Sequence, residues 1–74
     1  MAKGKGKGSV YRVTEIVGTS RTSWEDAARN AVQTAARSLR DLRVAEVIKA
    51  DLVIEGGKVV AFRTRVSLSF KYEG

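Results

Sequence analysis

The last third of the chain shows the clearest alternation of apolar and polar positions. Even-numbered positions carry the apolar face of this stretch and include Val60, Phe62, Thr64, Val66, Leu68, Phe70 and Tyr72. From Arg63 onward, the odd-numbered positions are charged or small and polar. A period of two residues is typical of a strand with one buried face. Residues 59–72 are therefore predicted to form a long β-strand.

Two further segments have the composition of strands. Residues 10–17 read VYRVTEIV and are rich in β-branched residues, and Gly18 is predicted to end this strand. Tyr11, Val13 and Val17 fall on one side of it, with Glu15 among them. That mixed side is compatible with a polar cavity or an interface.

The third predicted strand, residues 44–54, reads VAEVIKADLVI. Strict alternation would place Val44, Ile48, Leu52 and Ile54 on one side of it. The sequence Glu55-Gly56-Gly57-Lys58 follows, and paired glycines supply the positive φ of a tight hairpin. Residues 44–54 and 59–72 are therefore predicted to pair as a hairpin.

The segment between the first two strands has helical periodicity. Apolar residues recur at spacings of three and four in Trp24, Ala27, Ala28, Ala31, Val32, Ala35 and Leu39. Ser23 is a suitable N-cap, with Asp26 three residues later as in a capping box. A helix is predicted from Trp24 to about Arg40, with an alanine-rich stripe that permits close approach to a sheet.

The predicted architecture is α+β: a β-α-β-β domain with a three-stranded antiparallel sheet wrapped on one helix. It spans residues 10–73, after a Gly/Lys-rich tail over residues 1–9 that is expected to be disordered. A strand of about 14 residues spans roughly 45 Å, which is long for so small a domain. It must curve sharply or pair with a neighbouring copy. One helix also covers only one face of the sheet, so a closed homo-oligomer is predicted.

Composition supports this prediction and limits the chemistry. At 74 residues the chain is short for an independently stable domain, and it has no Cys and no His. Disulfides, thiolate metal sites and histidine bases are thereby excluded, and no nucleophile elbow or phosphate-binding loop is found in its required context. Nothing in the composition or the spacing points to a reaction, so the chain is not predicted to be an enzyme.

The net charge is +6, of which Lys3, Lys5 and Lys7 of the tail contribute half. The remaining excess is modest: it favours phosphate-bearing ligands but is only weak evidence for nucleic acid, which is therefore an unlikely partner. No apolar run approaches the length of a membrane span, and no signal peptide is recognised, so no membrane partner and a cytoplasmic location are expected.

More than one reading stays open for several candidate residues. Trp24 serves as a stacking platform for a planar ligand or as an anchor that fixes the helix start to the sheet. Arg63 and Arg65 bind a phosphate, form intersubunit ion pairs, or simply face solvent. The scattered carboxylates cap and solvate the surface or bind calcium across a subunit boundary.

Several segments in order resemble the dodecins. They are Val17-Gly18-Thr19-Ser20, then Ser23-Trp24-Glu25-Asp26-Ala27-Ala28, then Ala45-Glu46-Val47, and finally Ser69-Phe70. The resemblance implies a hollow homododecamer in which flavin-binding members (FMN or riboflavin) stack paired isoalloxazine rings between tryptophans. It also implies storage of a small ligand by burial.

The chain departs from the flavin-binding pattern at two positions. Val44 stands where those dodecins have the stacking tryptophan, and Arg63 stands where they have a glutamine that hydrogen-bonds the ring. The resemblance places the ligand site at Arg43, Val44, Glu46, Arg63 and Arg65. Because valine has no large π-face, the chain looks closer to the dodecins that lack this tryptophan, some of which bind calcium. A calcium-binding or purely structural shell is thus the alternative to flavin storage, with the metal ligands not assigned.

Overall fold

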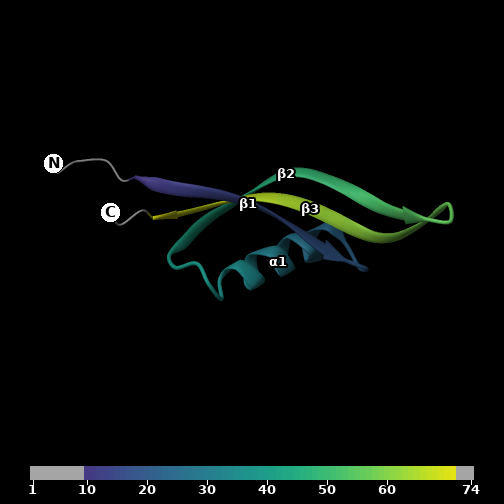
Figure 1. Ribbon diagram of the computed structural model, residues 1–74, viewed down its shortest axis with the longest axis horizontal. Helices are drawn as coiled ribbons and strands as arrows, with labels where there is room; N and C mark the ends of the chain where they lie inside the picture. Colours follow the sequence, from purple (N-terminus) through teal and green to yellow (C-terminus); the bar gives the residue numbers. More distant parts are fainter. Residues whose placement is uncertain (1–9, 72–74) are drawn as a thin grey trace.

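A computed structural model describes residues 10–71, so the Gly/Lys tail predicted over residues 1–9 lies outside the described part. The elements follow the order β1 (Tyr11–Ser20), α1 (Trp24–Ala35), β2 (Leu42–Glu55) and β3 (Lys58–Lys71). The strands form one antiparallel sheet in the order β1-β3-β2, and α1 packs on one of its faces (Figure 1). The predicted β-α-β-β fold is confirmed.

The core lies between the alanine stripe of α1 and one face of the central strand. Its buried apolar residues are Ala27, Ala31, Ala35, Val66 and Leu68. Gly18 of β1 is also buried, and a Cβ built on it would lie 2.0 Å from the carbonyl oxygen of Ala27. Glycine is therefore what allows β1 to approach the helix backbone.

The start of α1 is fixed by side chains. The Ser23 hydroxyl accepts a hydrogen bond of 3.0 Å from the Asp26 amide, which confirms the predicted N-cap. The Trp24 indole Nε1–H donates to the Asp51 carbonyl at 2.9 Å, and its ring meets Phe62 edge-on at 5.2 Å between centroids. Trp24 thus anchors the helix start to the β2–β3 hairpin, the second of the two readings of this residue.

Two predicted element ends were wrong. Gly18 does not terminate the first strand, because β1 continues to Ser20. The glycine lies inside the strand where β1 crosses α1, and a residue without a Cβ is needed there. The helix ends at Ala35 instead of about Arg40. Ser38 and Leu39 both donate their amides to the Ala35 carbonyl, which closes the helix in a tightened turn.

The predicted sides of the second strand were also wrong. The pairing of β2 with β3 shifts register between Leu42 and Val44, between Val47 and Lys49, and again between Val53 and Ile54. Val44 therefore lies opposite Ser69, whereas Leu52 lies opposite Phe62 on the other face. β-Bulges of this kind reverse the alternation, and period-two reasoning cannot anticipate them.

The chain is extended in one direction. It measures 57 × 21 × 16 Å, and the β2–β3 hairpin projects past α1 at the end away from the termini (Figure 1). Many large apolar side chains on the strands are exposed, among them Val13, Val44, Val47, Leu52, Ile54 and Val59. In the described part, no helix has both the length and the apolar character needed to cross a membrane.

Candidate functional site

The face of the sheet that α1 leaves uncovered collects most of the polar chemistry. We call it the open face. Its register-aligned residues are Val13, Glu15 and Val17 of β1, Arg63, Arg65, Ser67 and Ser69 of β3, and Val44, Glu46, Lys49 and Asp51 of β2. On β3 these positions alternate with Thr64, Val66 and Leu68, which are buried against the helix. The open face is therefore the surface available to a ligand or to another copy.

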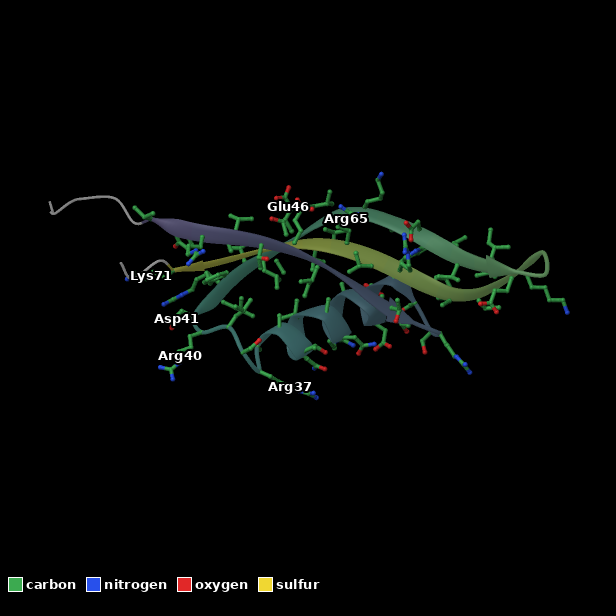
Figure 2. The ribbon with its side chains drawn as sticks, viewed as in Figure 1. Arg37, Arg40, Asp41, Glu46, Arg65 and Lys71 are labelled. Carbon is green, nitrogen blue, oxygen red and sulfur yellow. The ribbon has the colours of Figure 1, made fainter. Side chains whose placement is uncertain are left out.

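One row across the open face carries two carboxylates. Ser67 of β3 lies directly between Glu15 of β1 and Glu46 of β2. Two strand spacings separate the outer residues, so their Cα atoms lie about 10 Å apart. Glu46 and Arg65 both project from the side of the sheet opposite α1 (Figure 2). The row thus presents carboxylate and hydroxyl oxygens in one direction.

Arg65 partly neutralises this row. Its Nη1 lies 3.4 Å from Glu15 Oε1, and both side chains are about half exposed. A single long contact between exposed groups contributes little to stability, because solvent screens it. Glu15 is therefore available to exchange Arg65 for another cation at low cost.

Arg63 is held much more firmly. Its guanidinium donates two hydrogen bonds to the Asp51 carboxylate, from Nε to Oδ1 at 2.7 Å and from Nη2 to Oδ2 at 2.8 Å. This bidentate geometry fixes the fork of the arginine. The hydrogen bonds from Arg63, helped by the nearby charges of Lys49 and Arg65, hold the pKa of Asp51 below its ordinary value of 3.8. In turn, the hydrogen bonds to the Asp51 carboxylate and its negative charge raise the pKa of Arg63.

This pair should give the protein a measurable acid sensitivity. The pKa of Asp51 is lower in the folded chain, so its stabilisation is complete above the unfolded pKa and is lost as pH falls through the folded pKa. Asp51→Asn should lower the free energy of unfolding at neutral pH by an amount that shrinks below about pH 4. Denaturant unfolding of both proteins from neutral to acid pH tests this. A difference that persists unchanged at about pH 2 would contradict it.

Comparison with known proteins decides the family. The dodecin family model matches residues 10–73, nearly the whole chain. The chain belongs to the dodecin family. This confirms the resemblance read from the sequence, and with it the prediction of a non-enzymatic binding protein.

Individual dodecins are similar over most of their length. The calcium dodecin of Mycobacterium tuberculosis is 48% identical over 63 residues, which cover 85% of this chain and 89% of that protein. Its crystal structure, described as having a novel calcium-binding site, matches with a TM-score of 0.77 over 88% of this chain and 93% of that one. The structure of the Streptomyces coelicolor dodecin matches with a TM-score of 0.84, 38% identity and coverage of 100% and 99%.

The structure brings together only part of the predicted dodecin ligand site. Val44, Glu46, Arg63 and Arg65 all lie on the open face, but Arg43 falls in the bulge between Leu42 and Val44. Val44 pairs with Ser69, six positions along β3 from Arg63, or about 20 Å. Within one protomer, these two residues cannot contact the same small ring. The assignment of these five residues as a ligand site stays a prediction.

Sequence reasoning missed the partners that define the open face. Asp51, which fixes Arg63, and Ser67, which centres the carboxylate row, were not singled out. Their only signal is their register across the sheet, and the bulges of β2 hide that register. Among residues 10–71, no three of His, Cys, Asp and Glu gather closely enough to hold a metal ion.

Proposed function

We propose that this dodecin forms a homododecameric shell that binds calcium ions through the open faces of its sheets. The observation that carries the proposal is the row Glu15–Ser67–Glu46, which lies on the face that α1 does not cover. Calcium prefers carboxylate, hydroxyl and water oxygens and takes six to eight of them. A symmetry-related copy supplies the oxygens that one row lacks.

Assembly is supported by what a single chain leaves unburied. Among residues 10–71, five apolar residues form the buried core, whereas twelve large apolar side chains are exposed. Both outer strands of the sheet, β1 and β2, have an unpaired edge. Such edges and patches are hazards in a monomer, and a closed symmetric assembly removes them. Dodecins assemble as homododecamers, so this is the oligomer proposed here.

The residues favour calcium over flavin. Val44 has no aromatic face, and the guanidinium of Arg63 is already engaged by Asp51 in two hydrogen bonds. A relative at 48% identity is named a calcium dodecin. Flavin storage is therefore the less favoured function for this chain. The proposal also includes a cytoplasmic location.

Native mass spectrometry with added calcium tests both parts. The full-length protein should show the mass of a dodecamer and take up calcium. Glu46→Gln should weaken calcium binding by about tenfold or more while the dodecamer persists, because a charged ligand oxygen is lost. Glu55→Gln is the matched control: it removes the same charge at the end of the hairpin strand, away from the row.

Three outcomes would count against the proposal. A monomer or dimer in native spectra removes the shell. A dodecamer that takes up no calcium removes the ion and leaves a structural shell. Equal weakening by Glu46→Gln and Glu55→Gln attributes calcium binding to overall charge and not to the row.

A further inference from the structure

The outer edge of β1 is more regular than the outer edge of β2. Within residues 10–71, β1 lies at one side of the sheet and pairs with β3 along its whole length, Tyr11–Ser20, without a register shift (Figure 1). The pairing of β2 with β3 has three shifts, and the Trp24 indole binds the Asp51 carbonyl. Shifts of this kind bend a strand and interrupt its row of backbone groups. β1 is therefore the better template for a further strand.

The flank of α1 beside this edge leaves room for another chain. A groove of about 780 Å³ follows the edge of β1, because Val13 and Val17 line it from one side of the strand and Ile16 from the other. On the helix it is lined by Asn30, Ala31, Thr34 and Ala35. These four side chains are small or uncharged, so a second copy placed along β1 meets no charge from them.

The exposed side chains of β1 are symmetric about Glu15. Val13 and Val17 lie two positions to either side of it on the open face, and they are 61% and 44% exposed. If two β1 strands pair antiparallel with Glu15 at the centre, Val13 of each copy lies opposite Val17 of the other. A centre one residue away, at Thr14 or Ile16, puts one of the valines opposite a glutamate. Directly opposed apolar residues stabilise a strand pair, so Glu15 is the favoured centre.

The charges on the open face fit the same register. Two Glu15 side chains meet at the centre, and like charges directly opposite each other are unfavourable. Each glutamate has its own counter-ion, because Arg65 Nη1 lies 3.4 Å from Glu15 Oε1. Arg65 lies opposite Val17 in the register with β3, so the two arginines fall on opposite sides of the symmetry axis. Two carboxylates and two guanidinium groups then alternate around the axis, with no net charge.

We propose that two copies of this dodecin pair their β1 strands antiparallel, centred on Glu15, so that their two sheets become one. Addition of a strand to a free sheet edge is a common mode of protein recognition. This inference rests on the homo-oligomer of the proposed function and names one contact within it. It also brings the carboxylate row of one copy into line with the row of the other, which supplies the oxygens that one row lacks.

Introduced cysteines report this pairing directly, because the chain has no Cys of its own. The full-length double variant Val13→Cys/Val17→Cys, oxidised mildly in calcium-free buffer, should give disulfide-linked dimers on a non-reducing gel. Opposed Cα atoms lie about 4.5–5.5 Å apart in such a pair, within the range of a disulfide. The two cysteines of one strand lie about 13 Å apart and cannot bond each other.

The two single variants are the matched controls. In Val13→Cys and in Val17→Cys, each cysteine faces a valine of the other copy, so neither protein should form linked dimers. Linked dimers from either single variant would show a different register or random collision. The absence of linked dimers from the double variant would show that β1 does not pair with a second β1. Both results overturn the proposal.

A charge exchange tests the centre at Glu15. Glu15→Lys places four cations around the axis and should reduce the assembled fraction in native mass spectra by about tenfold or more. Glu15→Lys/Arg65→Glu restores the alternation of charge and should recover the assembly. Glu55→Lys is the matched control, because it makes the same change at the end of β2 and should leave assembly unchanged. If the exchange recovers nothing, or if Glu55→Lys is equally harmful, Glu15 is not the centre.

The same measurements separate this contact from the shell itself. A dodecamer in which the double cysteine variant forms no link keeps the proposed shell and overturns the β1 pairing. A linked dimer that never reaches the mass of a dodecamer supports the β1 pairing and removes the shell.

Discussion

Gly18→Ala is expected to prevent this dodecin from folding into a stable assembly. The added Cβ would lie 2.0 Å from the Ala27 carbonyl oxygen, 2.9 Å from the Ala31 Cβ and 3.0 Å from the Ala31 amide nitrogen. Two of these atoms belong to the helix backbone, so no side-chain rotation relieves the overlap. Either β1 or α1 must move away, and the core between them opens. Overpacking on backbone costs about 3 kcal/mol or more, a large part of the stability of a small domain.

Size-exclusion chromatography and denaturant unfolding measure this effect. Gly56→Ala is the matched control, because its added methyl group meets nothing within 4 Å. Its cost comes only from the positive φ of 58°, about 1 kcal/mol. A Gly18→Ala protein that unfolds like the Gly56→Ala protein would show that the helix and β1 are not packed as closely as described.

Gly18 also illustrates the limit of local sequence reasoning. In the sequence, a glycine after a β-branched run is a strand terminator, and that interpretation was wrong because a glycine inside a strand serves equally for close backbone approach. Whether a glycine ends a strand or permits close approach depends on which part of the fold faces it. The alanine stripe of α1 was visible in the sequence, but its pairing with Gly18 was not. The strands, the helix cap at Ser23 and the hairpin at Gly56-Gly57 depend on local chemistry, and they were predicted.

The candidate site shows the same division. The even positions of β3 were predicted correctly, and Arg63 and Arg65 were correctly placed opposite the apolar side. The positions of β2 were not, because its bulges move Val44 and Leu52 to different faces. Both the carboxylate row and the Arg63–Asp51 pair span two strands. A site that exists only across strands cannot be read from one strand's period.

Leu68→Ala should cause the second large loss of stability. Leu68 is 1% exposed and packs with Val66, Ala31 and Ala35 in a core that has few other members. Truncating a buried leucine removes its burial and leaves a cavity, at a cost of about 2–5 kcal/mol. The surrounding residues relax only partly into such a space, so most of the cavity should remain. We expect a marked fall in the denaturant midpoint and partial dissociation at low protein concentration.

Leu52→Ala is the matched control for Leu68→Ala. Leu52 is the same residue type, but it lies on the projecting hairpin and is 39% exposed in the single chain. Both variants must be unfolded at equal protein concentration, since assembly couples stability to mass action. A loss for Leu68→Ala alone places the stability within the protomer core. Comparable losses for both would mean that the shell buries the hairpin, with much of the stability residing between protomers. A loss of less than about 1 kcal/mol in the free energy of unfolding for Leu68→Ala would contradict the described core, since truncation of a fully packed leucine destabilises a protein by more than that.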